Sequence, residues 1–252
     1  MTHHATNSPQ KPTALITGAG QRIGAIIAAH LAAQGYDLVV HYHQSEVEAK
    51  ALAARLFAEH GCTVTLKQAD LADPAALERF WEGLPVCAVL IHNASRFTRD
   101  TLATMTAASL RAHLAINFES PLLLTQGFMT QIPTEKTGNI IVLGDGMMGW
   151  SIAPQFFSYA VSKHAWSSVI DVLAASCAPR VRANVIALGA TLNGANDDEA
   201  TFTRLAERAP LKRHGAPAEV LTAIDFLLSA PGITGQVISL ANGFGLASAR
   251  PV

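Results

Sequence analysis

Short apolar segments alternate with longer helical patterns from Thr13 to the end of the chain, and this alternation restricts the fold more than any other feature. It is typical of βαβ units, in which parallel strands form one sheet and the connecting helices cover both faces. The segments with strand character are Thr13–Thr17, Tyr36–Tyr42, Thr63–Asp70, Ala88–Ala94, Gly138–Gly144, Arg182–Gly189 and Gly235–Ala241. We therefore expect a doubly wound α/β fold with a parallel sheet of about seven strands.

The length and composition favour a single domain. The chain has 252 residues, half of them hydrophobic, and no Pro- or Ser-rich linker divides it. We expect a disordered arm over residues 1–11 and one domain over residues 12–252. Residues 191–213 follow a strand with weak periodicity, so a substrate lid is expected over about residues 190–213.

Local signals also predict where helices begin and end. Ser45 and Glu48 fit a capping box that opens a helix, and Gly61 is placed to close it. Gly35 ends the preceding helix in the same way. Two longer helices are predicted over Ala107–Met129 and Phe156–Ala178.

Charge and hydropathy argue against several classes of partner. The formal net charge is -1 and no basic stripe is present, so neither nucleic acid nor an anionic membrane is expected to bind. No apolar stretch approaches the roughly 18 residues that span a bilayer, and the N-terminus is polar. Cys62, Cys87 and Cys177 lack metal-site or disulfide spacing, and so does the His3-His4 pair. We expect a cytoplasmic protein without a metal site.

A glycine-rich turn follows the first strand directly. The turn reads Thr17-Gly-Ala-Gly-Gln-Arg-Ile-Gly24, and a helical apolar pattern begins at Ile23. Such a turn lets the backbone approach a pyrophosphate, whose charge lies at the positive helix N-terminus. Gly18, Gln21, Arg22 and Ile23 are therefore candidate cofactor ligands.

The end of the second strand indicates which dinucleotide would bind. Enzymes that prefer NAD commonly place a carboxylate there to bind the ribose 2′-hydroxyl. This chain instead has His41, Tyr42, His43, Gln44 and Ser45, whose polar groups could accommodate a 2′-phosphate. The sequence therefore predicts NADP(H) as the cofactor.

Tyr159 and Lys163 lie one helical turn apart, on a common face of a predicted helix. A phenol with a pKa of about 10 is a poor acid at neutral pH, and a nearby ammonium would lower that pKa. The pair is a candidate proton donor.

The turn T-G-x-x-x-R-x-G together with Tyr159 and Lys163 resembles the short-chain dehydrogenase/reductase family, and the resemblance covers about residues 13–246. It implies a Rossmann-type fold in which Lys163 holds the nicotinamide ribose and Asn117 supports a proton-relay water. It also implies that Asp70 and Leu71 border the adenine. Further cofactor ligands implied by the resemblance are Asn93, Ala94, Gly189 and Thr191.

Asp145 stands where most family members have a serine that orients a substrate carbonyl. A carboxylate there would repel the alkoxide charge that develops in ketone reduction. It suits a pterin, whose ring offers N–H donors and an imine to be protonated. The interval from Asp145 to Tyr159 is 14 residues, one more than usual, so the extra residue either bulges outward or displaces the carboxylate.

Further residues are similar to the pteridine reductase and dihydromonapterin reductase subgroup of the family. These are Arg22 in the phosphate turn, Ser95 and Phe97 after Asn93-Ala94, and the run His41-Tyr42-His43-x-Ser45. The resemblance implies that Phe97 stacks on the pterin, and that Arg22 and Ser95 contact cofactor phosphate or substrate.

We therefore expect NADPH-dependent reduction of a dihydropterin, such as dihydromonapterin or dihydrobiopterin, at a ring C=N bond. Asp145, Tyr159, Lys163 and Asn117 are the candidate catalytic residues. One alternative is a general short-chain carbonyl or alcohol oxidoreductase, and another is a dinucleotide-sensing scaffold with little turnover. Family resemblance also implies a homotetramer that packs through the two long helices.

Overall fold

The computed structural model describes residues 11–146, 154–193 and 199–247. Within them, seven strands form one parallel sheet in the order β3-β2-β1-β4-β5-β6-β7. The strands are β1 (Thr13–Ile16), β2 (Asp37–Tyr42), β3 (Val64–Gln68), β4 (Val89–His92), β5 (Gly138–Asp145), β6 (Val181–Leu188) and β7 (Val237–Leu240). The strand order reverses between β1 and β4, and in such sheets ligands bind at the carboxyl end of that switch point. The predicted fold class is confirmed.

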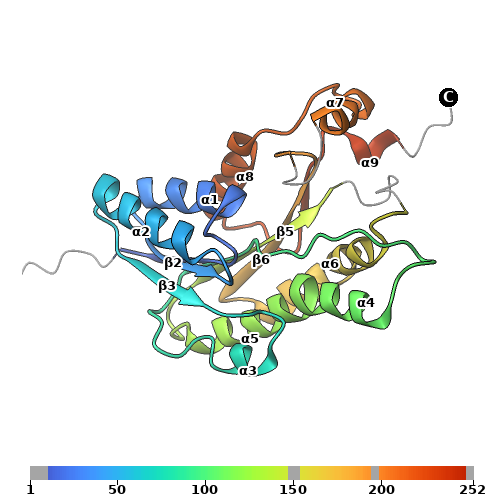
Figure 1. Cartoon of the computed structure of the whole chain (residues 1–252). Helices are drawn as coiled ribbons and strands as arrows, with labels where there is room; N and C mark the ends of the chain where they lie inside the picture. The colour runs from blue at the N-terminus through green and yellow to red at the C-terminus, as the bar shows by residue number, and fades with distance from the viewer. Residues whose placement is uncertain (1–10, 147–153, 194–198, 248–252) are drawn as a thin grey trace, which may run out of the picture.

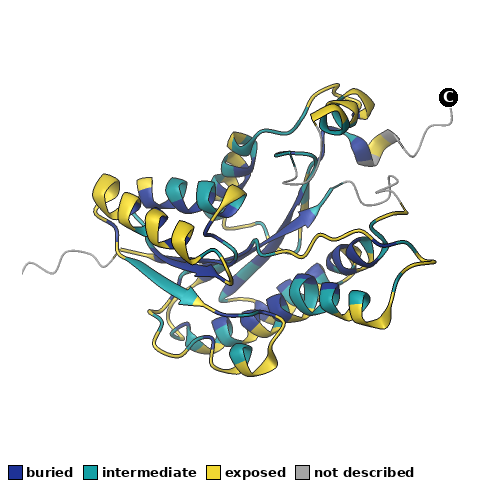
Figure 2. Ribbon diagram, in the orientation of Figure 1, coloured by how far each residue is buried: buried dark blue, intermediate teal, exposed yellow. Residues whose placement is uncertain are grey.

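Helices cover the sheet on both faces (Figure 1). One face carries α1 (Arg22–Ala33), α2 (Glu46–His60) and α8 (Pro217–Ser229); the other carries α3 (Pro74–Glu78), α4 (Ala107–Leu114), α5 (Ser120–Gln131) and α6 (Phe157–Cys177). Each layer has its own apolar core, in which Ile27 and Leu56 contribute to the first and Phe128 and Trp166 to the second. The inner strands are buried, while the edge strands β3 and β7 and the outer helix faces are more exposed (Figure 2).

The predicted helix ends are correct in position but one cap is wrong. α2 ends at Gly61, which has a φ of 59°, and Gly35 follows α1 with a φ of 88°. Ser45 precedes α2, but its side chain makes no capping hydrogen bond. Its hydroxyl instead lies against Gly20, so close that a Cβ would not fit there. The N-terminus of α2 therefore lacks the cap that the sequence predicts.

The helix predicted over Ala107–Met129 is interrupted. A π-helical turn, η1 (Ala115–Glu119), separates α4 from α5. Pro121 has no N–H to donate to the carbonyl of Asn117 four residues earlier, so the regular ladder cannot continue there. The Asn117 carbonyl accepts a hydrogen bond from the Trp166 indole instead, at 2.8 Å. The other long helix, predicted over Phe156–Ala178, is observed as α6.

Two helices lie at the carboxyl end of the sheet, beyond β5 and β6: α7 (Glu199–Arg208) and α9 (Phe244–Ala247) (Figure 1). The predicted lid thus contains α7, while its residues 194–198 lie outside the described residues. The predicted N-terminal arm, except Lys11, also lies outside them, as does the loop with Met147, Met148 and Trp150.

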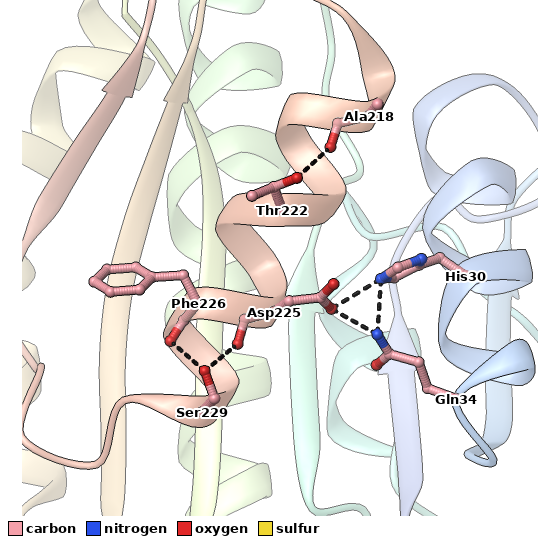
Figure 3. A network of polar contacts seen from close by, with 7 residues as sticks. All are labelled: His30, Gln34, Ala218, Thr222, Asp225, Phe226 and Ser229. Carbon is pink, nitrogen blue, oxygen red and sulfur yellow. Dashed lines mark hydrogen bonds and ion pairs between the residues drawn. The ribbon is translucent and has the colours of Figure 1, made fainter.

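A polar network joins α1 to α8 on the opposite side of the sheet from α6 (Figure 3). Asp225 accepts a hydrogen bond from Gln34 and contacts the His30 imidazole, each at 2.8 Å. No helix among the described residues is long and apolar enough to cross a membrane.

Candidate active site

The glycine-rich turn packs directly against the end of β4. Gly18 has a φ of 62°, and a Cβ on it would lie 2.9 Å from the Cα of Ala94. The Asn93 amide donates to the carbonyls of Thr17 and Gly18 at 2.8 and 2.9 Å. The Thr17 hydroxyl in turn accepts from the backbone N–H groups of Asn93 and Ala94 at 3.0 Å. The turn is therefore held rigidly, with glycine required where backbone meets backbone.

The start of α1 offers a site for an anion. Gln21 precedes the helix and makes no side-chain capping hydrogen bond, and the first turn has no acidic residue. Gly24 in the first turn packs so closely on the Gly18 carbonyl and Asn93 that a side chain would overlap them. These features fit a pyrophosphate bound at the helix N-terminus.

The His41 imidazole is already hydrogen-bonded within the protein at both nitrogens. Its Nδ1 accepts from the Gly18 N–H at 3.0 Å, and its Nε2 donates to the Ala69 carbonyl at 3.1 Å. Burial lowers its pKa from 6.5 to about 4, so the ring is neutral at pH 7. His41 thus connects the glycine-rich turn to β2. The ring offers no free N–H to a phosphate.

The residues after β2 are better placed for a 2′-phosphate. His43, Gln44 and Ser45 line the same cleft as Gly18 and Arg22. His43 is half-exposed, with its Nε2 3.8 Å from Asp70, and the uncapped N-terminus of α2 follows immediately. Tyr42, in contrast, is buried.

One large cleft lies along the carboxyl ends of β1, β2 and β4, with a volume of about 890 Å³. Most of the predicted cofactor and substrate residues line it: Gly18, Gln21, Arg22, Ile23, His41, Tyr42, His43, Ser45, Asp70, Leu71, Asn93, Ala94, Ser95 and Phe97. The remaining predicted residues, Asn117, Asp145, Tyr159, Lys163, Gly189 and Thr191, lie outside its lining. Phe97 and Phe156 line the cleft, and the Phe97 ring also contacts Tyr159.

Asp145 and Tyr159 meet at the end of β5. Asp145 is the last residue of that strand, in register with Leu188, and the Tyr159 hydroxyl donates to its Oδ2 at 2.7 Å. The additional residue between them therefore does not pull the carboxylate away. Burial, and then the charge and hydrogen bond of Asp145, raise the pKa of Tyr159 well above 10.

Lys163 does not act on the phenol as expected. Its Nζ donates to the carbonyl of Leu143 at 2.9 Å. The predicted lowering of the Tyr159 pKa by Lys163 is wrong for this geometry, because burial and Asp145 dominate. Burial also lowers the pKa of Lys163 to about 8, although Asp145 counteracts part of that effect.

Asn117 binds the segment after β4 through its side chain. Its Oδ1 accepts from the Arg96 N–H at 2.7 Å and from the Ser95 hydroxyl at 3.2 Å. Its Nδ2 donates to the Arg96 carbonyl and to Ser162. Because Trp166 occupies the Asn117 carbonyl, all the polar groups of this residue beyond its N–H have protein partners.

Phe97 forms part of an aromatic group beside the phenol. It is half-exposed, stacks on Phe156 with centroids 4.3 Å apart, and meets Tyr159 edge-on at 4.6 Å. The Arg99 guanidinium lies over the other ring of the stack, 5.0 Å from the Phe156 centroid. A flat aromatic surface is thus available next to the Tyr159 phenol.

The loop after β6 reaches the phosphate turn. The Arg22 guanidinium donates to the Asn193 carbonyl at 2.9 Å, across the carboxyl end of the sheet. Thr191 is buried and donates to the Gly189 carbonyl. Arg22 has a φ of 55°, a backbone conformation uncommon for a residue with a side chain.

Several residues of the site were missed by sequence reasoning. Phe156 and Trp166 belong to no motif. Pro121, four residues after Asn117, does indicate that the Asn117 carbonyl lacks its helical partner, and Trp166 is the residue that binds this carbonyl. His92 is buried, bonded through Nε2 to Thr125, and its pKa falls to about 3, chiefly through burial. The sequence also gave no indication that Asp100 binds Ser158 at the start of α6.

Comparison with known proteins identifies the family. A family model described as enoyl-(acyl carrier protein) reductase matches residues 18–245. A 3-oxoacyl-[acyl-carrier-protein] reductase of Synechocystis is 30% identical, covering 91% of this chain and 95% of the relative. A dihydromonapterin reductase of Enterobacter is 27% identical, covering 98% and 99%.

A solved structure is similar over nearly the same length. The FolM alternative dihydrofolate reductase 1 of Brucella canis, complexed with NADP, superposes with a TM-score of 0.86 at 30% identity, covering 93% of this chain and 94% of that one. The chain belongs to the short-chain dehydrogenase/reductase family, and it is an oxidoreductase. Both keto-reducing and pterin-reducing relatives are similar to it, at comparable identity.

Proposed function

We propose that the protein uses NADPH to reduce a dihydropterin, such as dihydromonapterin or dihydrobiopterin, to the tetrahydropterin. The observation that carries the proposal is the 2.7 Å hydrogen bond from the Tyr159 hydroxyl to Asp145. A carboxylate at this place can accept hydrogen bonds from ring N–H groups, which a ketone lacks. The similarity to a dihydromonapterin reductase and to the NADP-bound structure supports the same proposal.

The chain's residues fit NADP(H). The α1 N-terminus and the turn that Gly18 and Gly24 permit suit the pyrophosphate. His43, Ser45 and the uncapped start of α2 suit the 2′-phosphate, and no acidic residue between Tyr42 and Ser45 repels it.

The proposed chemistry divides between cofactor and protein. Bound NADPH supplies a hydride to the carbon of the ring C=N bond. Tyr159 donates its proton to the nitrogen of that bond, and Asp145 orients the phenol and binds the ring. The raised pKa of Tyr159 makes the phenol a weak acid that is protonated at neutral pH. It gives up its proton only to the strongly basic nitrogen that hydride addition to the C=N bond produces. Phe97 stacks on the heterocycle.

Lys163 and Asn117 complete the proposed catalytic set. Lys163 holds the nicotinamide ribose, and its side chain carries charge below pH 8. Asn117 fixes the segment that carries Phe97, through its bonds to Arg96. We propose that the second lone pair of its carbonyl, which already accepts from Trp166, steadies a relay water that returns a proton to Tyr159.

A carbonyl or alcohol oxidoreductase is the second candidate, favoured by the similarity to a 3-oxoacyl-[acyl-carrier-protein] reductase. In that case Asp145 would be tolerated beside a carbonyl. A dinucleotide-sensing scaffold with little turnover is a third, and the joined Tyr159 and Asp145 argue against it.

The test is NADPH oxidation by the purified protein with a panel of dihydropterins, dihydrofolate and simple ketones. The proposal expects turnover of at least one dihydropterin, and Tyr159→Phe reduces it by about 100-fold or more. Turnover of ketones alone would support the second candidate. Full activity of Tyr159→Phe would exclude Tyr159 as proton donor.

We also propose a homotetramer that packs through α5 and α6. Leu123 on α5 and Val161 and Val172 on α6 are exposed apolar residues on these helices. Light scattering on the purified protein would determine the assembly.

A substrate lid over about residues 190–213 is proposed as well. It includes the helix α7, and the hydrogen bond from Arg22 to the Asn193 carbonyl connects it to the glycine-rich turn. The three unpaired cysteines suit a cytoplasmic, reducing location.

A further inference from the structure

Asp100 lies on the loop between β4 and α4, yet its buried side chain binds the start of α6. Its Oδ1 accepts from the Ser158 N–H at 2.9 Å, and its Oδ2 accepts from the Ser158 hydroxyl at 2.5 Å. The Ser109 hydroxyl donates to the same Oδ2 at 2.8 Å. One carboxylate therefore joins the loop, α4 and α6.

The backbone strengthens this connection. The Asp100 N–H donates to the Gln155 carbonyl and the Phe157 N–H donates to the Asp100 carbonyl, each at 3.0 Å. Asp100 and Phe156 thus form a short parallel bridge. Asp100 enters the first turn of α6 from 58 residues away in sequence.

The start of α6 needs such a partner. The residue at its N-cap, Phe156, has no side-chain acceptor for the unpaired N–H groups of the first turn. A carboxylate there also interacts favourably with the positive end of the helix dipole. Burial raises the pKa of Asp100, but the hydrogen bonds from Ser158 and Ser109 outweigh this and leave the pKa below 3.8. The group is ionised at neutral pH.

The position of the phenol depends on this first turn. Tyr159 is the next residue after Ser158, and its hydroxyl must reach Asp145 on β5 at 2.7 Å. The same loop carries Phe97, which stacks on Phe156 and meets Tyr159 edge-on.

The loop is held at alternate residues. Arg96 is bonded by Asn117, Thr98 by His113 and Asp100 by Ser158. The intervening residues Phe97 and Arg99 line the cleft, and so does Thr98.

We propose that Asp100 is a positioning residue that fixes the aromatic surface of Phe97 and Phe156 and the hydroxyl of Tyr159 relative to each other. The inference rests on the proposed function, since it concerns the same proton donor. Asp100 touches neither the phenol nor the proposed substrate position, so it acts through Ser158 and the loop.

The test compares Asp100→Ala with Asp73→Ala. Asp73 caps α3 by accepting from the Ala75 N–H at 3.0 Å, so this control removes a similar cap far from α6. With the panel substrate that the wild type reduces best, Asp100→Ala is expected to lower kcat about 10- to 100-fold, as small misplacements of catalytic groups do. NADPH affinity should remain within about twofold, because the phosphate turn is untouched.

Two further variants keep the test decisive. Ser158→Ala removes the hydroxyl bond but keeps the backbone bond, so kcat should fall less than in Asp100→Ala. Asp100→Asn keeps an acceptor for the Ser158 N–H and should restore part of the loss.

A second readout does not need a substrate. The ionisation of Tyr159 can be followed by ultraviolet difference absorbance, with Tyr159→Phe as the blank. In Asp100→Ala and Ser158→Ala the raised pKa of Tyr159 should move toward 10, because the phenol no longer sits against Asp145. Asp73→Ala should leave that pKa unchanged.

The outcomes separate the two proposals. If the wild type reduces no member of the panel, the proposed function fails, while the phenol titration still decides the role of Asp100. If the Asp100 and Ser158 variants match Asp73→Ala in kcat and in phenol ionisation, the positioning role is overturned. If the wild type turns over a panel substrate, a movement of the Tyr159 pKa toward 10 in the Asp100 variant without any loss of kcat would also overturn the positioning role.

Discussion

Replacing Asp145 with serine should exchange the substrate preference of the enzyme. Serine is the residue expected at this place in most family members, and Asp145→Ser removes the negative charge that faces the reacting bond in the proposed function. It also removes the acceptor of the Tyr159 hydrogen bond at 2.7 Å. We expect dihydropterin reduction to fall and ketone reduction to rise.

The magnitudes follow from simple electrostatics. A carboxylate about 4 Å from a developing alkoxide is repelled by about 4 kcal/mol at an effective dielectric constant near 20. Asp145 is only partly buried, and solvent screening reduces this to about 1 to 3 kcal/mol. Loss of a hydrogen bond to a charged acceptor costs about 1.5 to 3 kcal/mol on the pterin side. Together, these effects should lower the ratio of kcat/KM for dihydropterin over ketone by about 70-fold or more.

The assay measures kcat/KM for one dihydropterin and one ketone in the wild type, in Asp145→Ser and in a charge-matched control. Asp225→Ser serves as the control, because that carboxylate lies between α1 and α8, bonded to His30 and Gln34 (Figure 3). The control should leave the ratio unchanged. An unchanged ratio in Asp145→Ser would show that the carboxylate does not select the substrate.

Three further predictions concern pH and packing. Because burial lowers the pKa of Lys163 to about 8, the reduction rate should fall as pH rises through 8 and the side chain loses its charge; a rate that stays unchanged up to pH 10 would contradict this. The folded-state pKa of His41 is about 4 against 6.5 ordinarily, so the stability it contributes is complete above pH 6.5 and is lost as pH falls toward 4. His41→Gln should therefore reduce the pH dependence of the unfolding free energy by up to about 1.4 kcal/mol per pH unit. Urea unfolding at pH 7 and pH 5 would refute this if the free-energy difference between the two pH values were the same in the variant as in the wild type. Gly24→Ala should weaken NADPH binding about tenfold or more, since its Cβ would overlap backbone, whereas Gly232→Ala, with open space around it, should not; fluorescence titration with NADPH that gives equal affinities would contradict the packing.

The sheet could be predicted from sequence because most strands are short apolar runs; β3, which reads VTLKQ at the sheet edge, is the most polar. Seven predicted segments correspond to seven observed strands among the described residues, with ends displaced by a few residues. The helix ends at Gly35 and Gly61 were also predictable, since glycine adopts a positive φ without strain.

Tertiary contacts account for what the sequence could not predict. The side chain of Ser45 turns toward Gly20 rather than capping its own helix. Both nitrogens of the His41 imidazole are hydrogen-bonded, one to Gly18 and the other to Ala69, and the sequence around His41 predicts neither bond. Lys163 bonds to the Leu143 carbonyl instead of acting on the phenol. In each case a spatial neighbour decides which hydrogen bond forms.

The candidate site was predictable where the chemistry depends on residue type and strand ends. Asp145 and Tyr159 meet as expected from their places at the end of β5 and in α6. Asp100 was not foreseeable, because its partner Ser158 lies 58 residues away and a loop aspartate has no distinguishing pattern.

The most direct measurement of the central claim follows deuterium from NADPH deuterated at its reactive C4 position, with a dihydropterin and a ketone offered together at equal concentration. The product of the wild-type enzyme is analysed by mass spectrometry and NMR. The claim predicts tetrahydropterin with one deuterium on the carbon of the former C=N bond. Deuterium found only on the alcohol carbon of the reduced ketone would contradict it.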